Sequence, residues 1–297
     1  MTEPSPPTVS EPTDNPIIKH LVISGGGAAG FSFYGALRES NKKNIWTLDA
    51  LETIHGTSVG SMMAVMISLG YDWDTLDDYL IKRPWHMVYK FNLYSFMDGL
   101  SKRGIFDKKV MEETLGPLLS GKDMSVNITM QEYYENTKVE LHIYATEMNK
   151  FESVDISYKT HPDWKLIDAV YASSSLPVLF APWIIDGNCF CDGGFMMNYP
   201  IPACIRNGAN PKEIMGISRV SDVNNRITID ENSSVIEYGI MLVYRIMERL
   251  LTPPVHVDLG LEYKITSPRL SLNDIIETAA SQDERIRLID NGAKYVN

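Results

Sequence analysis

The chain has 297 residues, enough to form one large domain or two modest ones around a sizeable core. Its 44% hydrophobic and 22% charged residues are typical of an ordinary soluble globular protein. The formal charge of -11 argues against nucleic acid as the main partner and against simple electrostatic adsorption to an anionic membrane.

Residues 1–15 are rich in Pro, Ser, Thr and acidic residues and have no apolar core, so we expect a disordered tail and no signal peptide. No apolar run reaches the ~20 residues that a bilayer-spanning helix needs. The three cysteines, Cys189, Cys191 and Cys204, fit reduced thiols in a cytoplasm-like compartment, and no companion ligands indicate a metal. We therefore expect residues 16–297 to form a single soluble domain without a metal or cofactor.

Hydrophobic periodicity predicts strands that alternate with helices along the chain. The expected strands are 17–24, 51–60 (entering a tight turn), 139–148, two within 183–194 that turn at Asp186-Gly187, and 213–220. The expected helices are a short one through Leu37, then 61–70, 71–81, 106–119, one within 164–182 that Pro177 ends, 234–251 and 273–295. This alternation predicts an α/β fold with a largely parallel sheet.

The first strand ends on the sequence GGGAAG, Gly25 to Gly30, which fits the pattern G-x-G-x-x-G. A dinucleotide-binding loop has this pattern with an acidic residue about 20 positions later, and Asp49 stands at such a place. A glycine turn that lets a strand and a helix pack closely fits equally well. The third interpretation is an oxyanion hole, in which backbone N–H groups at a helix N-terminus stabilise a developing negative charge.

The second motif is Gly56-Thr57-Ser58-Val59-Gly60, which fits the nucleophile elbow G-x-S-x-G. In such an elbow a sharp turn between a strand and a helix exposes the serine hydroxyl, and side chains at the glycines would crowd the turn. The predicted strand before Ser58 and the apolar helix after it supply that context. Ser58 is therefore the candidate nucleophile, with Gly56 and Gly60 shaping the elbow.

A serine nucleophile needs a base, and the sequence offers two candidates. An α/β-hydrolase triad would combine Ser58 and Asp192 with His256, the one histidine late enough in the chain. His55, on the strand that enters the elbow, is better explained as a buried structural residue. The other candidate base is Asp192 itself, in the sequence Asp192-Gly193-Gly194. These glycines are common in turns, and they also leave room for a nucleophile to approach the carboxylate.

The three motifs GGGAAG, GTSVG and DGG, in this order, resemble those of the patatin-like phospholipase family. The resemblance covers residues 17–295 and includes the segment ASSSLPVLFAPWIIDGNCFCDGGFMMNYP. It implies a three-layer α/β/α fold with a mixed, mostly parallel sheet, similar to that of cytosolic phospholipase A enzymes. It also implies that Ser58 is the nucleophile, that Asp192 activates it without a histidine, and that the oxyanion hole is formed by Gly25, Gly26, Gly27 and Ala28.

The implied reaction is hydrolysis of lipid acyl esters through an acyl-serine intermediate, in a membrane or micellar substrate. One position departs from the family pattern, because Ala29 stands where an arginine or lysine usually precedes the last glycine of the first motif. The missing cation leaves an inactive, lipid-binding relative as an alternative. The sequence identifies no activating protein partner.

Two segments are candidates for contact with a membrane surface. Residues 81–106 mix basic and aromatic side chains, which suits a membrane interface but also a segment packed over the sheet: Lys82, Arg83, Lys90, Lys102 and Arg103, with Trp85, Tyr89, Phe91, Tyr94 and Phe96. The helix expected at 234–251 carries Ile236, Ile240, Val243 and Met247 on one face, which fits either core packing or lipid docking.

Overall fold

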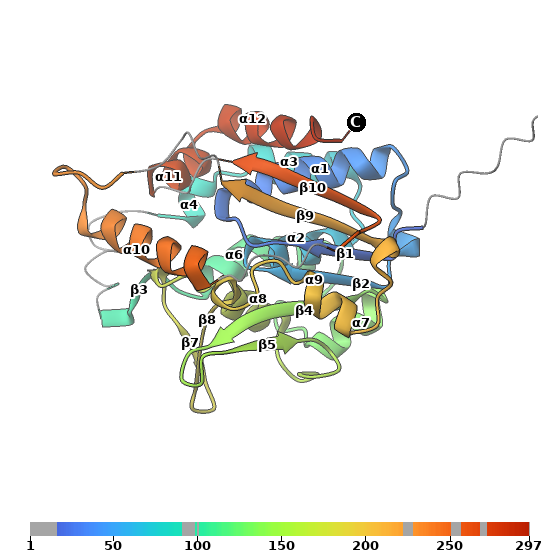
Figure 1. Ribbon diagram of the computed structural model, residues 1–297, viewed down its shortest axis with the longest axis horizontal. Coiled ribbons are helices and arrows are strands. Elements are labelled where there is room, and N and C mark those ends of the chain that lie inside the picture. Colours follow the sequence, from blue (N-terminus) through green and yellow to red (C-terminus); the bar gives the residue numbers. More distant parts are fainter. Residues whose placement is uncertain are drawn as a thin grey trace, which may run out of the picture.

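The computed structural model describes residues 17–90, 99, 101–221, 228–250, 257–267 and 272–296. The expected tail at residues 1–15 lies outside these residues. Figure 1 shows a central sheet with helices packed around it.

A mixed sheet of eight strands forms the centre of the described part of the chain, in the order β10-β9-β1-β2-β4-β8-β7, with β5 also paired to β4. The strands are β1 (His20–Ile23), β2 (Thr53–Thr57), β4 (Glu140–Glu147), β5 (Glu152–Ile156), β7 (Trp183–Ile185), β8 (Asn188–Asp192), β9 (Ile214–Ser221) and β10 (Leu261–Ser267). Neighbours from β10 to β4 run parallel, whereas β5, β8 and β7 are antiparallel to their partners. A separate parallel pair joins β3 (Gly104–Phe106) to β6 (Val178–Phe180).

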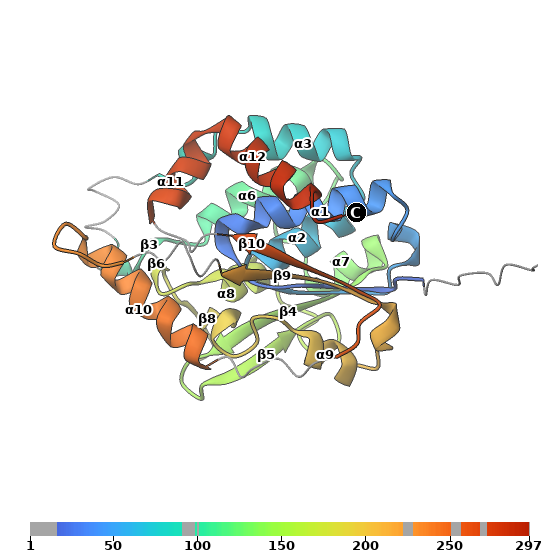
Figure 2. The same cartoon turned by 45° about the horizontal axis from the view of Figure 1, so that its top comes forward.

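Helices cover both faces of this sheet (Figure 2). The α-helices are α1 (Gly30–Lys42), α2 (Val59–Ser68), α3 (Trp73–Lys82), α4 (Trp85–Val88), α6 (Lys109–Ser120), α7 (Met130–Thr137), α8 (Leu166–Ser174), α9 (Ile201–Arg206), α10 (Val235–Leu250), α11 (Leu272–Ala280) and α12 (Gln282–Ala293). Short 3-10 helices are η1 (Gly27–Ala29), η2 (Leu48–Ala50), η3 (Gly193–Phe195) and η4 (Pro211–Glu213). None of the described helices is long and apolar enough to cross a membrane.

Strand β1 shows how the sheet separates two cores, because alternate side chains of a strand point to opposite faces. Leu21 and Ile23 belong to the large core, with residues of α1, α2, α6, α8 and α12. Val22 faces the other way and packs with Ile201 and Cys204 of α9. Since both faces of β1 are buried, its sequence is a continuous apolar run and not an alternating pattern. The predicted α/β fold with a mostly parallel sheet is confirmed.

The structure differs from the predicted elements in two ways. The helix expected at 273–295 is two helices, because the Ser281 side chain accepts a hydrogen bond from the Glu284 N–H and begins α12 as an N-cap. Strands β3, β5, β6 and β10 and helices α4, α7 and α9 were not expected. Of these, β10 carries the clearest signal, since the side chains of Tyr263, Ile265 and Ser267 are buried in alternation with exposed ones.

Candidate active site

Ser58 stands at the sharp turn between β2 and α2. Its backbone has φ 54° and ψ -123°, a conformation that a residue with a side chain rarely adopts, and it forms the N-cap of α2. A Cβ on Gly56 would lie 2.5 Å from the Gly60 carbonyl oxygen, and one on Gly60 would lie 2.8 Å from the Ser24 carbonyl oxygen. Both neighbours are backbone atoms that cannot move aside, so the turn requires glycine at both positions.

A hydroxyl from a distant helix holds this turn in place. The Ser58 N–H donates to Oγ of Ser173 at 2.9 Å, and the Ser173 hydroxyl donates to the Tyr144 carbonyl of β4 at 2.6 Å. The Thr57 hydroxyl donates to the Met197 carbonyl at 2.7 Å, which ties β2 to the loop that follows η3. Ser173 is a positioning residue that sequence reasoning missed, although it lies in the ASSS sequence of the segment that leads to Asp192.

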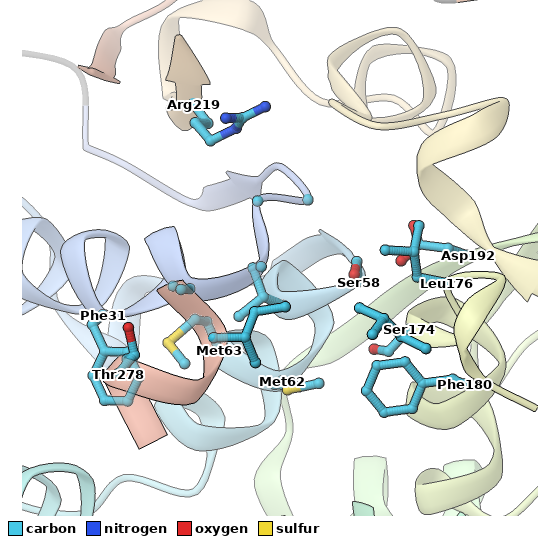
Figure 3. Close-up of a pocket in the computed structure, with 18 of the residues that line it drawn as sticks. Phe31, Ser58, Met62, Met63, Ser174, Leu176, Phe180, Asp192, Arg219 and Thr278 are labelled. Carbon is cyan, nitrogen blue, oxygen red and sulfur yellow. The ribbon is translucent and has the colours of Figure 1, made fainter. Parts of the chain in front are cut away.

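Asp192 ends β8 and is 3% exposed. Its carboxylate lies beside the Ser58 hydroxyl (Figure 3), and Oδ1 accepts a hydrogen bond from the Gly194 N–H at 2.7 Å. Burial raises the pKa of Asp192 to about 6, although the hydrogen bonds from Ser58 and Gly194 oppose the shift. A Cβ on Gly193 would collide with the Tyr144 carbonyl, so this residue must also be small.

The glycine loop lies beside Ser58 because β1 and β2 are parallel neighbours. Ile23 pairs with Gly56, and Gly25 and Ser58 each follow two residues later. The Gly25 N–H donates to the Asn198 carbonyl at 3.0 Å, so this amide already has an acceptor in the segment that follows η3. The first N–H groups of a helix have no acceptor inside it, and at η1 these belong to Gly26, Gly27 and Ala28, which line the same cavity as Ser58.

Ser58 and Asp192 lie on the wall of a cavity of about 230 Å³ (Figure 3). The rest of the wall is mostly apolar and comes from helices on several sides of the site: Phe31, Met62, Met63, Met66, Leu80, Trp85, Tyr89, Leu176, Leu179, Phe180, Tyr244, Met247 and Ile275. Such a wall favours an alkyl chain over a polar substrate. The cavity lies where β1, β2 and β9 end, and ligands of parallel sheets commonly bind at that edge.

Several polar residues of the cavity wall escaped sequence reasoning: Thr114, Ser174, Asn198, Arg219, Glu248 and Thr278. Arg219, near the end of β9, places a guanidinium on the wall, and Asn198 follows η3. Arg219 stands near the end of a predicted strand, 213–220, but only the fold shows that this strand runs parallel to β1 and ends at the same edge. Asn198 lies in an irregular segment whose position no sequence pattern predicts.

A comparison with protein-family models shows to which family the chain belongs. The model described as patatin-like phospholipase matches residues 21–205, more than half of the chain, a range that contains the glycine loop, Ser58 and Asp192. The chain belongs to the patatin-like phospholipase family. The fold class expected from the three motifs is therefore confirmed together with the family.

Two curated relatives of this patatin-like chain are viral proteins. An uncharacterized protein of Acanthamoeba polyphaga mimivirus is 30% identical over 184 residues, which cover 62% of this chain and 60% of the relative. A probable lipid hydrolase of Invertebrate iridescent virus 6 is 27% identical over 197 residues, 66% of this chain and 67% of the relative. The chain thus spans about three fifths of the first relative and two thirds of the second.

Among solved structures, VipD from Legionella pneumophila has the same fold as this patatin-like chain, with a TM-score of 0.50 and 18% sequence identity. The alignment covers 93% of this chain and 67% of VipD. At this identity the likeness concerns the fold, and it extends over nearly the whole chain.

The structure weighs against the dinucleotide interpretation. Asp49 is exposed in η2, which precedes β2, whereas the glycine loop follows β1. Because β1 and β2 are parallel, these two features lie at opposite ends of the sheet. Asp49 therefore cannot bind the ribose of a nucleotide held by the glycine loop.

None of the histidines among the described residues lines the cavity that holds Ser58. His55 is 1% exposed, hydrogen-bonds to Tyr144 Oη at 2.8 Å and stacks on His142 with ring centroids 4.3 Å apart. Burial lowers the pKa of His55 well below its usual value, so it is neutral and structural, as expected. His256 lies outside the described residues. No described group of three or more His, Cys, Asp or Glu side chains is placed to hold a metal ion.

The aromatic and basic segment 81–106 is only partly described, and Phe91, Tyr94 and Phe96 lie outside. Trp85 is 4% exposed, and both Trp85 and Tyr89 line the cavity. These two rings therefore form part of the cavity wall and not of a membrane interface. The face of α10 that carries Ile236, Ile240, Val243 and Met247 packs against Leu176, Leu179 and Phe195. That face is core, which agrees with one of the two interpretations.

Proposed function

We propose that this patatin-like chain is a serine lipid acyl hydrolase of phospholipase A type, with Ser58 as nucleophile and Asp192 as general base. The observation that carries the proposal is the pairing of the two side chains. Ser58 is held at a strained turn with its hydroxyl beside a buried carboxylate, on the wall of an apolar cavity. Family membership supports lipid ester hydrolysis as the reaction class.

In the first half-reaction the Ser58 oxygen attacks the acyl carbonyl carbon while its proton moves to the Asp192 carboxylate. The carbonyl oxygen becomes an oxyanion, which the N–H groups of Gly26, Gly27 and Ala28 stabilise as hydrogen-bond donors. The tetrahedral intermediate collapses to an acyl-Ser58 ester. The departing lipid alcohol takes the proton from Asp192, so that the carboxylate is regenerated.

In the second half-reaction water attacks the acyl-Ser58 carbonyl carbon and gives its proton to Asp192. Collapse of this intermediate releases the fatty acid, and the Ser58 oxygen recovers the proton from Asp192. A pKa of about 6 suits this role, because the carboxylate is ionised at neutral pH and is a stronger base than an exposed aspartate.

The cavity supports an assignment of substrate class. Its apolar wall suits the acyl chain. The wall also carries Arg219 and Glu248, and the Arg219 guanidinium suits an anionic group such as the phosphate of a phospholipid. Ala29 does not weaken the proposal, because backbone donors carry the oxyanion role and Arg219 supplies a cation within the cavity.

Turnover of a soluble aryl ester by single variants tests the dyad. We expect Ser58→Ala and Asp192→Asn each to lower kcat by about 10³-fold or more. Ser68→Ala is a matched control, since this serine is on the same helix and hydrogen-bonds to the Ala64 carbonyl, away from the cavity. It should retain turnover.

The same assay separates the two alternatives. A Ser58–Asp192–His256 triad requires His256→Ala to abolish turnover, whereas the dyad predicts a change of less than about threefold. A folded parent chain that hydrolyses neither aryl esters nor phospholipids would be the inactive lipid-binding relative, and the proposal would be wrong.

A further inference from the structure

Arg285, near the start of α12, is a buried arginine whose side chain joins two other helices. It is 1% exposed. Its guanidinium donates five hydrogen bonds, and each one goes to a backbone carbonyl oxygen of the described residues. Nε and Nη2 donate to Ile81 at 3.1 and 2.6 Å, Nη1 donates to Thr278 at 2.7 Å and to Ala279 at 3.0 Å, and Nη2 also donates to Arg83 at 3.4 Å.

These carbonyl groups belong to the C-terminal ends of α3 and α11. The last four carbonyl groups of a helix have no N–H partner within the helix, and they carry a partial negative charge that favours a nearby cation. Ile81 is in the last turn of α3, and Thr278 and Ala279 are in the last turn of α11. The planar fork of a guanidinium can donate to both ends at once, so Arg285 holds the two helix ends in a fixed relation.

Both helix ends border the cavity that holds Ser58. Leu80 of α3 and Trp85 of α4 line this cavity, and the Trp85 ring nitrogen donates to the Leu80 carbonyl at 2.8 Å. Ile275, Thr278 and Ala279 of α11 line it too. The shape of this part of the cavity therefore depends on how α11 is held against α3.

Helix α12 gives the guanidinium a fixed base, because it packs closely on α1. The Ser32 hydroxyl of α1 donates to the Leu288 carbonyl of α12 at 2.8 Å. A Cβ on Gly35 or on Gly292 would collide with the backbone of the facing helix. Since α1 begins directly after the glycine loop, α12 is fixed relative to the catalytic site, and its arginine holds α11 relative to the same site.

The α11 part of the wall lies apart from the candidate base. Figure 3 shows Thr278 and Phe31 on the opposite side of Ser58 from Asp192, with Met63 in between. The stretch of wall from Ser58 to α11 is thus largely apolar, which suits an alkyl chain. An acyl chain that is attached to Ser58 and runs along this stretch would meet α11 at its far end.

We propose that Arg285 is a positioning residue that holds α11 as the end wall of the acyl cavity and so sets the length of acyl chain that the site accepts. The inference rests on the proposed lipid ester hydrolysis, because that reaction supplies the acyl chain. Arg285 and α11 lie outside residues 21–205, which match the family model, so this role is a feature of the present chain and not of the matched region.

The ratio of kcat/KM for p-nitrophenyl laurate to that for p-nitrophenyl butyrate tests this role. Arg285→Lys keeps the charge but loses the planar fork, so one ammonium cannot hold both helix ends. We expect the laurate-to-butyrate ratio to fall about tenfold or more, because the distal methylene groups lose their contacts with α11.

Arg287→Lys is the matched control. Arg287 is an exposed arginine on the same helix, and its guanidinium donates to the Glu284 side chain at 2.7 and 2.6 Å. Its ratio should stay within about twofold of the parent value. Equal losses with laurate and butyrate in Arg285→Lys, an unchanged ratio, or the same fall in Arg287→Lys would overturn the inference.

Thr278→Phe is a second variant that leaves the arginine in place, and it decides the question if circular dichroism shows that Arg285→Lys does not fold. A larger side chain on the α11 wall should shorten the cavity and lower the laurate-to-butyrate ratio about tenfold or more. An unchanged ratio in a folded Thr278→Phe chain would show that α11 is not the end wall.

Calorimetric titration of laurate into the full chain with Ser58→Ala measures the same property without turnover. We expect the added change Arg285→Lys to weaken laurate binding about tenfold or more, and Arg287→Lys to leave it within about twofold. If the Ser58→Ala chain does not bind laurate, the inference is wrong. If the parent chain hydrolyses neither ester, the proposed function fails, while the titration still decides the role of Arg285.

Discussion

Asp192 is the residue whose environment differs most from that of an ordinary aspartate at the site. It is nearly fully buried, and its carboxylate lies beside the Ser58 hydroxyl and accepts a hydrogen bond from the Gly194 N–H. A buried charge that is only partly compensated is destabilising, and such residues are common where a base is needed. Burial of the ionised carboxylate lowers the stability of the fold, and the same burial raises the pKa of Asp192 and makes it a stronger base.

The pH profile of kcat/KM for a soluble ester follows from this environment. The base must be ionised, so activity is present above the pKa of Asp192 and is lost as pH falls through about 6. We expect log kcat/KM to rise with unit slope up to that pH and to level above it. Circular dichroism across the same range controls for acid unfolding, and a profile still flat at pH 5 would contradict the assignment of the base.

Ala29 departs from the family pattern, and its surroundings in the structure change what a cation at this position is expected to do. The sequence comparison indicates a missing cation at this site. In the structure Ala29 is 1% exposed and belongs to the large core. An arginine introduced there would have to bury its charge or displace the loop, so Ala29→Arg is expected to destabilise the chain and not to raise turnover.

At the scale of elements, the site depends on how β2, α2 and α8 are joined. The elbow at Ser58 is strained, and strained turns persist only where surrounding structure holds them. Ser173 of α8 provides that hold through its bonds to Ser58 and to β4. Substitution of this residue should therefore act on the reaction more than on substrate binding.

Ser173→Ala is expected to lower kcat about 10- to 100-fold with little change in KM, because the nucleophile loses its fixed position. Ser175→Ala is the matched control. Both serines are buried, but the Ser175 hydroxyl bonds only within its own helix, to the Tyr171 carbonyl at 2.6 Å. Steady-state kinetics and thermal unfolding of the two variants check this, and equal kcat values would show that Ser173 has no positioning role.

Sequence patterns predicted the elements that carry local signals and missed those that depend on distant partners. The apolar run before Gly25 and the elbow at Ser58 have local signatures, so β1, β2 and α2 were expected near their observed positions. Strand β10 pairs with β9, which lies far from it in the sequence. Its alternation of buried and exposed side chains is short, so it is recognised as a strand mainly once that partner is known. The break at Ser281 is a capping effect of a single side chain.

For the whole molecule, the sheet order explains why residues far apart in sequence meet. Parallel neighbours β9, β1 and β2 end at one edge, which places Arg219, the glycine loop and Ser58 together. Strand β8, antiparallel to β4, delivers Asp192 to the same place. The motifs predicted Ser58, Asp192 and Gly25 to Ala28 as site residues before this order was known. The chemistry of the cavity wall became apparent only from the assembled fold.

Covalent labelling tests the central claim most directly, because an alkyl fluorophosphonate reacts with a serine activated by a base. Intact-mass and peptide mass spectrometry of the full chain should show one adduct on Ser58. The adduct should be absent in Ser58→Ala, strongly slowed in Asp192→Asn and retained in His256→Ala. A folded chain that remains unlabelled, or that loses labelling with His256→Ala while Asp192→Asn labels normally, would contradict the Ser58–Asp192 dyad.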